Sequence, residues 1–328
     1  MAATLDEVAQ RAGVSKTTVS RVINNRGYIS TKTRNRVQAA IDELNYHPNS
    51  VARSLLGKST QLIGIIFPNT SNVFYAEMIE HIETRLFKRG YKTILCNSFN
   101  DPQKEVEYLK MLQGNQVDGI ITGSLNENIA EYRKLTLPIV SFDRYLGNRI
   151  PTVSSDNFEG GQLAAAALIR GKVKRVLLIS TSLSEMSPTD DRINAFAEKM
   201  EQQKITYKQI NIPFQTSPTM KKMFIRDEIR EFQPDGVMAT DDATAMLVRY
   251  QLELLGKRVP QDVQVIGYDG TRFMQEAFPE LSTIVQPIPD IAELLIELLI
   301  ERIEDPEKEL GKQYTLPVAL YGGGTAGS

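Results

Sequence analysis

The first 45 positions alternate apolar and polar residues at the spacing of short amphipathic helices. One helix is predicted over residues 5–12, where Thr4 opens a capping box and the apolar residues fall on one face. Gly13 supplies a turn, and Ser15 can cap a second helix that ends near Asn24. Two short helices joined by a tight turn that contains glycine form a helix-turn-helix. A third helix is predicted after Ser30 from Val37, Ala40, Ile41 and Leu44.

From residue 61 onward, short apolar runs alternate with helical stretches, which is typical of an α/β fold with parallel sheets. The predicted strands cover residues 61–67, 92–96, 119–122, 139–142, 175–179, 236–239 and 263–268. The predicted helices cover residues 74–89, 105–113, 158–169, 188–202 and 244–255. We therefore expect two doubly wound sheets, one on each side of about residue 155.

The segment between these two parts carries the pattern of a short helix. Pro48 breaks the preceding helix, Asn49 can cap a new one, and Gly57 can end it. Such a helix has only about eight residues, fewer than the roughly 12 to 15 that hold together alone in water. We expect it to fold only on DNA, paired with its copy from a second subunit, with Leu55 as an apolar wedge in the minor groove. A plain linker with a buried leucine is the alternative.

The charge distribution separates the head of the chain from its body. The 328 residues carry a net charge of −2, and 41% of them are hydrophobic and 24% charged, as in soluble globular proteins. The first 60 residues hold nine Lys and Arg against four Asp and Glu, a net charge of +5, and the remainder carries −7. A basic head on an acidic body indicates that the head binds a polyanion. A solvated charged face is the alternative.

Three classes of protein are disfavoured by the sequence. No segment has the roughly 18 uninterrupted apolar residues of a membrane span. The N-terminus carries acids where a secretory signal carries a basic region, so we expect a cytoplasmic protein. Cys96 is the only cysteine and is expected in the core, and with only two histidines beside it a zinc site is not expected.

The second helix of a helix-turn-helix presents its N-terminal residues to base edges in the major groove. Lys16, Thr17 and Thr18 occupy these positions, with Arg21 one turn further on. Either Lys16 or Arg21 could read guanine. Nearby hydroxyl and amide side chains suit phosphate oxygens, although each could be an ordinary cap or surface residue. The expected DNA contacts are Thr4, Ser15, Lys16, Thr17, Thr18, Ser20, Arg21, Asn24, Ser30, Thr33, Tyr46, Asn49, Ala52 and Leu55.

Carboxylates recur where predicted strands of the body end. Asp143, Asp241 and Asp269 each follow such a strand, and ligands of open α/β sheets bind beyond these strand ends. Ionised carboxylates accept hydrogen bonds from the hydroxyl groups of a sugar ring, and the pair Phe74-Tyr75 could stack on its face. Each aspartate could instead cap the next helix, and for Asp242 we favour that role.

A cation occupies an unusual place in one predicted helix. Ser187-Pro188 predicts a helix start, which puts Arg192 one turn inside the helix, where its charge opposes the helix dipole. It should therefore have an anionic or hydroxyl-rich partner. A salt bridge to Asp190 or Asp191 is the alternative.

Four motifs in the first 50 residues resemble the LacI/GalR family of bacterial repressors. They are Thr4-Leu5-Asp6-Glu7-Val8-Ala9, Ala12-Gly13-Val14-Ser15, Thr18-Val19-Ser20-Arg21-Val22, and Asn45-Tyr46 with Pro48-Asn49. The resemblance implies a helix-turn-helix headpiece, a hinge helix with its minor-groove leucine at Leu55, and a periplasmic-binding-protein-like core that binds an effector. It also implies that the residues at Lys16 and Thr17 vary with the operator.

The same resemblance implies effector contacts and domain boundaries. Arg192-Ile193-Asn194-Ala195-Phe196 matches a family pattern whose arginine holds effector oxygens. Further effector contacts are implied at Gly123, Asp143, Asp241 and Asp269. The chain is expected to cross back between subdomains near Gln286. The expected domains are a headpiece of residues 1–45, a hinge and linker of 46–60, an N-subdomain of 61–155 with 286–312, and a C-subdomain of 156–285 with 313–328.

Within the family, the stretches Gly267–Thr271 and Ser282–Ile288 resemble the sucrose-operon repressors of Gram-positive bacteria. This implies a homodimer that binds double-stranded operator DNA and answers a small sugar or a sugar phosphate. Regulators that answer ribose or another sugar, a nucleobase or a phosphorylated carrier protein share much of this segment, so they remain alternatives.

Two other classes of protein are alternatives to the repressor. A sugar-binding protein of a transporter has the same two-lobed body, but the helix-turn-helix and the acidic N-terminus favour the repressor. An enzyme is not expected, because the sequence has no phosphate-binding loop, no dinucleotide fingerprint and no metal cluster, and no cofactor is expected either. The expected mechanism is a population shift, in which the effector closes the cleft and changes how paired hinge helices sit on DNA.

Overall fold

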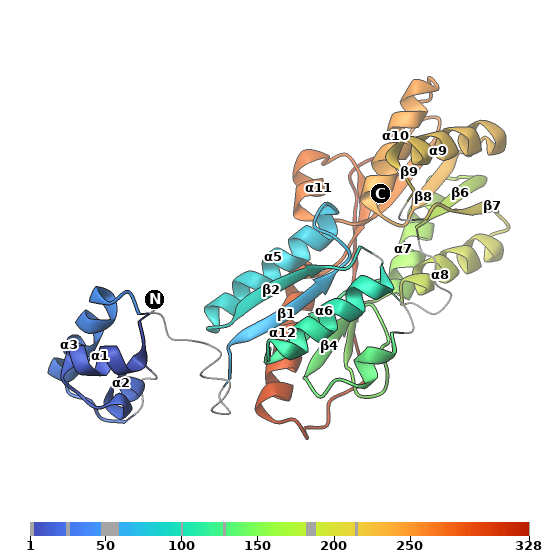
Figure 1. Cartoon of the computed structure of the whole chain (residues 1–328). Helices are drawn as coiled ribbons and strands as arrows, with labels where there is room; N and C mark the ends of the chain where they lie inside the picture. The colour runs from blue at the N-terminus through green and yellow to red at the C-terminus, as the bar shows by residue number, and fades with distance from the viewer. Residues whose placement is uncertain are drawn as a thin grey trace. The chain divides into compact units, whose positions relative to one another are not determined.

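The computed structural model describes residues 3–23, 27–46, 59–99, 101–126, 129–181, 188–213 and 216–327. The chain divides into two compact units, Met1–Thr60 and Gln61–Ser328 (Figure 1). None of the helices in the described ranges is both long enough and apolar enough to cross a membrane.

The first unit contains three helices, α1 (Leu5–Ala12), α2 (Lys16–Ile23) and α3 (Thr31–Glu43), which share one small apolar core. The predicted helix-turn-helix is therefore present as α1 and α2. The buried core residues are Val8, Ala9, Ala12, Val19, Val22, Val37 and Ala40.

Local polar contacts set the ends of these helices as the sequence predicted. The backbone N–H of Glu7 donates to the Thr4 hydroxyl at 3.3 Å while the Glu7 carboxylate accepts from the Thr4 N–H at 2.7 Å, which completes the capping box. Gly13 ends α1 at a φ of 60°, a left-handed conformation that suits glycine. Ser15 and Ser30 accept from the backbone of Thr18 and Thr33 at the starts of α2 and α3.

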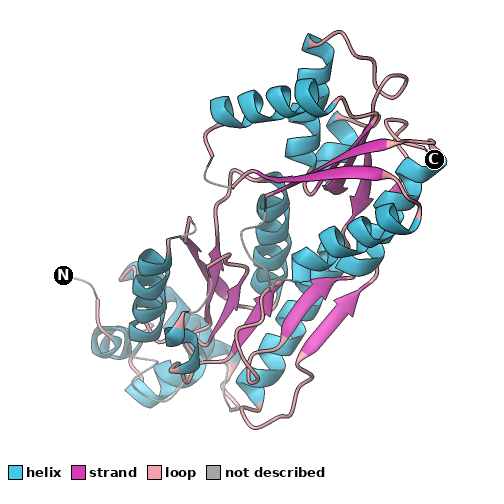
Figure 2. Ribbon diagram, turned by 90° about the vertical axis from the view of Figure 1, so that its right-hand side faces the viewer, coloured by secondary structure: helices cyan, strands magenta, loops and turns pink. Residues whose placement is uncertain are grey.

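The second unit is built from two sheets with helices on both faces, and we call each sheet with its helices a lobe (Figure 2). The strands of the first lobe run parallel in the order β11-β5-β4-β3-β1-β2. They are β1 (Leu62–Phe67), β2 (Lys92–Asn97), β3 (Gly119–Thr122), β4 (Ile139–Phe142), β5 (Thr152–Ser155) and β11 (Gln313–Leu316). The helices are α5 (Val73–Lys88), α6 (Pro102–Gly114), η1 (Ala130–Arg133) and α12 (Ile288–Glu304).

The second lobe repeats this arrangement in the order β12-β10-β9-β8-β6-β7, with only β12 antiparallel to its neighbour. Its strands are β6 (Arg175–Ser180), β7 (Thr206–Asn211), β8 (Gly236–Ala239), β9 (Gln264–Asp269), β10 (Ser282–Val285) and β12 (Ala319–Tyr321). Its helices are α7 (Asn157–Arg170), α8 (Pro188–Gln202), α9 (Pro218–Phe232), α10 (Asp242–Leu254) and α11 (Arg272–Ala277).

The central strands are apolar on both faces because helices cover both sides of each sheet. In the first lobe, α5 and α12 share one core with the sheet, and α6 and η1 share the other. In the second lobe, α7 and α8 cover one face, and α9 and α10 cover the other. The predicted parallel α/β architecture with two wound sheets is confirmed.

The chain passes between the lobes three times, after β5, after β10 and between β11 and β12. The second passage falls at Gln286, between β10 and α12. We expected residues 313–328 to lie wholly in the C-subdomain, but β11 pairs with β5 in the first sheet, so only the part after it joins the second lobe. The expectation failed because β11 and β12 are short edge strands with no apolar run to assign them to a sheet.

Candidate functional site: an interlobe cavity and a helix-turn-helix surface

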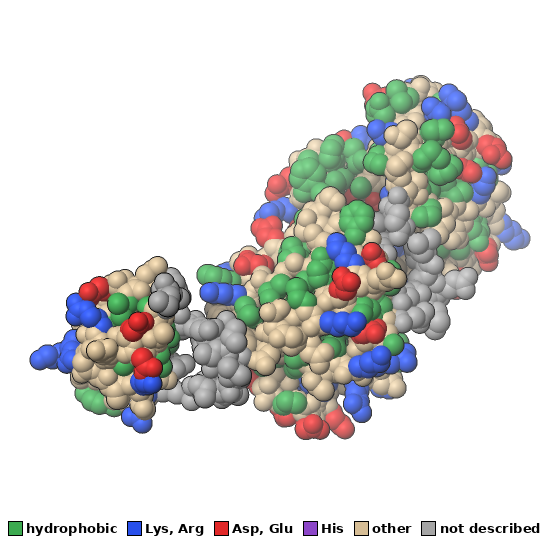
Figure 3. Space-filling model, in the orientation of Figure 1, with side chains coloured by type: hydrophobic (Ala, Val, Ile, Leu, Met, Phe, Trp, Pro, Cys, Tyr) green, Lys and Arg blue, Asp and Glu red, His purple; other side chains and the backbone are tan. Residues whose placement is uncertain are grey.

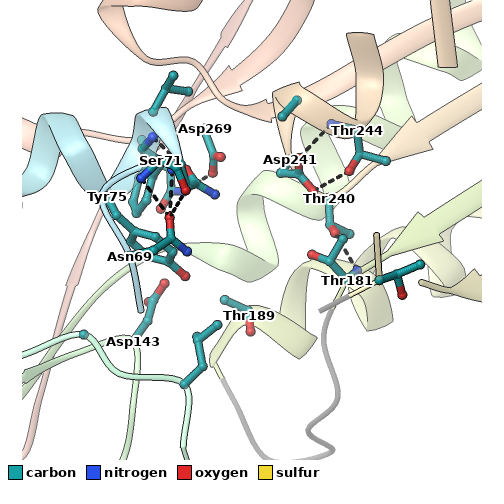
Figure 4. Close-up of a pocket in the computed structure, with 18 of the residues that line it drawn as sticks. Asn69, Ser71, Tyr75, Asp143, Thr181, Thr189, Thr240, Asp241, Thr244 and Asp269 are labelled. Carbon is teal, nitrogen blue, oxygen red and sulfur yellow. Dashed lines mark hydrogen bonds between the residues drawn. The ribbon is translucent and has the colours of Figure 1, made fainter. Parts of the chain in front are cut away.

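A cavity of about 780 Å³ lies at the carboxyl ends of strands from both lobes. Figure 4 shows Asn69, Tyr75 and Asp143 of the first lobe on one side and Thr181 and Asp241 of the second lobe on the other. All seven residues expected to contact the effector line this cavity: Phe74, Tyr75, Gly123, Asp143, Arg192, Asp241 and Asp269.

Asp143 and Asp269 occupy equivalent places at the ends of β4 and β9, and both have a left-handed backbone, with φ of 53° and 115°. Such a conformation is unfavourable for a residue other than glycine and is concentrated at functional sites. Burial raises the pKa of Asp143 to about 6, against the opposing attraction of Arg192. Burial, together with the nearby Asp242 charge, raises the pKa of Asp269 well above its ordinary value.

Arg192 is a buried cation, 5% exposed, that is held by neutral oxygens. Its Nε and Nη2 donate to Oδ1 of Asn157 at 2.8 and 2.5 Å, and its Nη1 donates to the carbonyl oxygen of Thr240 at 3.1 Å. We expected an anionic or hydroxyl-rich partner, with a salt bridge to a neighbouring aspartate as the alternative. The acceptors of these hydrogen bonds are instead a neutral amide oxygen on another helix and a backbone carbonyl oxygen at a strand end. Within the described ranges, these contacts engage three of its five N–H groups.

The helix cap expected at Asp242 is formed by Asp241, which also lines the cavity. Asp241 is the N-cap of α10: its carboxylate accepts from the backbone and hydroxyl of Thr244, both at 2.8 Å. Asp242, which we expected to cap, lies inside the helix and is buried, accepting from the Gly270 N–H at 2.8 Å and the Thr283 hydroxyl at 2.6 Å. Burial raises the pKa of Asp242 to about 7. The sequence did not separate them because either of two adjacent aspartates can cap.

Aromatic rings form the wall of the cavity on the first-lobe side. The rings of Phe74 and Tyr75 meet edge to face with centroids 5.6 Å apart, and Phe74 also contacts Phe142 at 5.7 Å. A Cβ at Gly123 would overlap the ring of Phe67, so this position needs glycine to let the end of β3 pack against that ring. Tyr75 is the less buried of the pair and lies beside the carboxylates (Figure 4).

Sequence reasoning missed many polar residues of the lining, because hydroxyl and amide groups in loops carry no periodic signal. Asn69 is one such residue: its Oδ1 accepts from the backbone N–H groups of Ser71 and Asn72 and so shapes the loop before α5. The polar lining residues that were not predicted include Asn69, Ser71, Asn126, Thr181, Thr189, Lys221, Thr240 and Gln286.

The predicted base-reading side chains lie on one exposed helix of the headpiece. Lys16, Thr17 and Arg21 of α2 are exposed, and Lys16 forms an ion pair with Asp6 of α1. Figure 3 shows Lys and Arg side chains beside acidic ones on the visible face of this unit.

Other predicted DNA contacts have local partners or lie elsewhere. The hydroxyls of Ser15 and Thr18 are 2.9 Å apart, as are those of Ser30 and Thr33. Tyr46 is half-buried against the headpiece core, and Ser20 is half-buried on α2. Asn24, Asn49, Ala52 and Leu55 lie outside the described residues.

Within the described ranges, no group of three or more His, Cys, Asp or Glu side chains is placed to hold a metal ion. Cys96 is buried, as expected.

Comparisons with known proteins find related proteins for both units of the chain. Residues 4–49 match the bacterial regulatory proteins of the lacI family, and residues 165–326 match the periplasmic binding protein-like domain. The sucrose operon repressors of Pediococcus pentosaceus and Streptococcus mutans are each 47% identical to this chain, over 98% of it and 99% of their own length. The crystal structure of the lac repressor dimer bound to operator and the anti-inducer ONPF superposes with a TM-score of 0.84 at 25% identity, covering 98% of both chains. The chain thus belongs to the LacI family of bacterial regulatory proteins.

Proposed function

We propose that the protein is a sequence-specific DNA-binding repressor of a sugar-utilisation operon, that of sucrose, controlled by a small sugar or sugar phosphate in the interlobe cavity. The observation that carries the proposal is the joining of a helix-turn-helix to a cavity lined at its strand ends by Asp143, Asp241 and Asp269. The near full-length similarity to sucrose operon repressors supports sucrose as the sugar.

The lining of the cavity suits a polyhydroxylated ligand. Carboxylate oxygens accept hydrogen bonds from sugar hydroxyls, while Arg192 donates to ring and hydroxyl oxygens. The ring of Tyr75 offers an apolar surface to the C–H face of a sugar. A volume of about 780 Å³ is within the usual range of small-molecule sites. In this role the aspartates bind and orient the ligand, and none acts as a catalyst.

The DNA-binding half of the proposal needs two copies of the chain. A homodimer presents two α2 helices to successive major grooves, so the operator is a near-palindrome with half-sites about one helical turn apart or a multiple of it. The protein acts in the cytoplasm, where the DNA is. Sugar binding changes the population of lobe arrangements and with it the affinity for operator.

The test measures operator binding by the full-length protein with and without sugar. Fluorescence anisotropy with a labelled near-palindromic duplex gives the dissociation constant alone and with saturating sucrose, sucrose phosphate or ribose. We expect a response to sucrose or its phosphate, with a rise in melting temperature for the same sugar. A chain that is monomeric and binds no duplex at low salt would contradict the proposal.

A further inference from the structure

Two hydrogen bonds link the segments that pass between the lobes. The backbone N–H of Asp156, just after β5, donates to the carbonyl oxygen of Leu316 at the end of β11, at 2.7 Å. The hydroxyl of Ser155 donates to Oε1 of Gln286 at 2.7 Å. Because Gln286 lies between β10 and α12, this second bond joins two of the three passages through one side chain.

The other end of the Gln286 side chain reaches the cavity. Its Nε2 donates to Oδ1 of Asp269 at 2.8 Å, and its backbone N–H donates to the Asp269 carbonyl oxygen at 3.0 Å. Gln286 is 3% exposed and Ser155 is 2% exposed, so water competes little for either bond. An amide has one donating and one accepting end, so a hydroxyl on one side and a carboxylate on the other fix its orientation.

The two hydrogen bonds of the Gln286 side chain, from Ser155 and to Asp269, reach different lobes, and we call them together the bridge. Ser155 ends β5 of the first sheet, and Asp269 ends β9 of the second. A rotation of one lobe against the other changes the separation of these two residues, whereas the length of the Gln286 side chain does not change. The side chain can therefore keep both bonds only near the lobe arrangement seen here.

We propose that Gln286 is a positioning residue that couples occupancy of the cavity to lobe rotation, an inference that rests on the proposed function. Asp269 lines the cavity (Figure 4) and its carboxylate accepts from Gln286, so a ligand that donates to this carboxylate would share it with Gln286. A sugar hydroxyl that donates to this carboxylate stabilises its ionised form, and an ionised acceptor makes the stronger bond to the Gln286 amide. Ligand binding thus strengthens the bridge and favours the arrangement in which both bonds exist.

The raised pKa of Asp269 makes this carboxylate responsive to such a ligand. Burial and the charge of Asp242 act against ionisation, and the bond from Gln286 acts for it. Additional donors from a sugar act in the same direction as Gln286, so the ligand and the bridge reinforce each other.

A first experiment tests the bridge without any ligand, by hydrogen exchange of the full-length protein. Gln286→Met keeps a similar side-chain length and removes both bonds, and Ser155→Ala removes only the bond to the first lobe. We expect the backbone amides of Asp156 and Ile288 to exchange about tenfold faster in both variants, while amides of β1 keep their rates. Ser154→Ala is the matched control, because its side chain points to the opposite face of β5. Unchanged exchange at the passages would overturn the bridge.

A second experiment tests the coupling by measuring the factor by which saturating sucrose or sucrose phosphate changes operator affinity. We expect this factor to fall about tenfold toward one in Gln286→Met and to stay at the wild-type value in Ser154→Ala. An equal factor in the variant and the wild type would overturn the coupling, whereas a wild-type protein that answers neither sugar contradicts the proposed function itself. If Gln286→Met fails to fold, as judged by circular dichroism, Ser155→Ala decides the same question.

Discussion

The guanidinium carbon of Arg192 lies 3.6 Å from the centre of the Tyr268 ring. The ring is buried, and a desolvated stack of this kind contributes roughly 2 kcal/mol. Together with the bonds to Asn157 and Thr240, the stack fixes the cation before any ligand arrives. Arg192 is thus a preorganised donor at the edge of the cavity.

We predict that Arg192→Ala shifts the response to higher sugar concentrations while operator binding persists. The loss of a charge-assisted hydrogen bond should weaken sugar binding by roughly 2 kcal/mol, or about 30-fold in Kd. Isothermal titration with sugar and anisotropy with operator measure the two effects separately. Wild-type sugar affinity in the variant would show that Arg192 serves only to join α8 to its neighbours.

Sugar binding should depend on pH because burial raises the pKa of Asp143 to about 6. The ionised carboxylate accepts hydroxyl donors, so the contribution of Asp143 to affinity should be complete above about pH 7 and be lost as the pH drops through 6. Asp242, with a pKa of about 7, titrates in the same range. Asp143→Asn therefore serves as the control: titrations between pH 5 and 8 should show a flatter profile in this variant. An identical profile would assign the pH dependence to another group.

Gly161→Ala should destabilise the second lobe by roughly 3 kcal/mol through overpacking. A Cβ at this position of α7 would overlap the backbone carbonyl of Arg192 in α8, and backbone cannot rotate away as a side chain can. Gly114→Ala is the matched control, because a Cβ at the end of α6 meets open space. The control should be neutral or slightly stabilising. Urea denaturation monitored by circular dichroism compares the two, and equal free energies of unfolding would show that α7 and α8 can separate without cost.

In the headpiece, Arg21→Ala should weaken operator binding about tenfold and reduce discrimination against altered operators. Arg21 is exposed on α2, the helix that enters the major groove in this motif. Arg11→Ala removes the same charge from α1, where the side chain pairs with Glu43 of α3. Anisotropy with cognate and altered duplexes distinguishes the loss of base contacts, which reduces sequence discrimination, from the loss of a positive charge, which weakens binding to all duplexes. Equal effects of both substitutions would mean that Arg21 contributes only electrostatic attraction.

The sequence predicted those elements whose own residues carry the signal. The apolar run of β1 and the capping residues of α1 and α3 act within a few positions, so their spacing is sufficient. In contrast, β5 reads Thr152-Val153-Ser154-Ser155 and was missed, because its burial comes from neighbours that are distant along the chain. The amphipathic helix α9 was missed as well.

The sequence predicted the residues of the candidate site that directly follow apolar strands. It predicted less well the contacts between residues that are distant along the chain. Asp143 and Asp269 were found because they follow apolar strands. One acceptor for Arg192 is Asn157, which belongs to another helix. A glutamine after a strand, such as Gln286, has no sequence pattern that marks a hydrogen-bonded link between lobes. Such tertiary contacts form only when distant segments of the chain pack together, so no local sequence pattern marks them.

The placement of β11 and β12 has a consequence for the order in which the nascent chain matures. Each forms an outer edge of a different sheet, and the Thr325 side chain then accepts from Ser282 and donates to Val265. Neither lobe can complete this edge of its sheet until residues 313–325 have been synthesised. The DNA-reading head has all its core residues available long before that. During synthesis, the headpiece can therefore fold while both sheets of the two-lobed unit still lack their last strands.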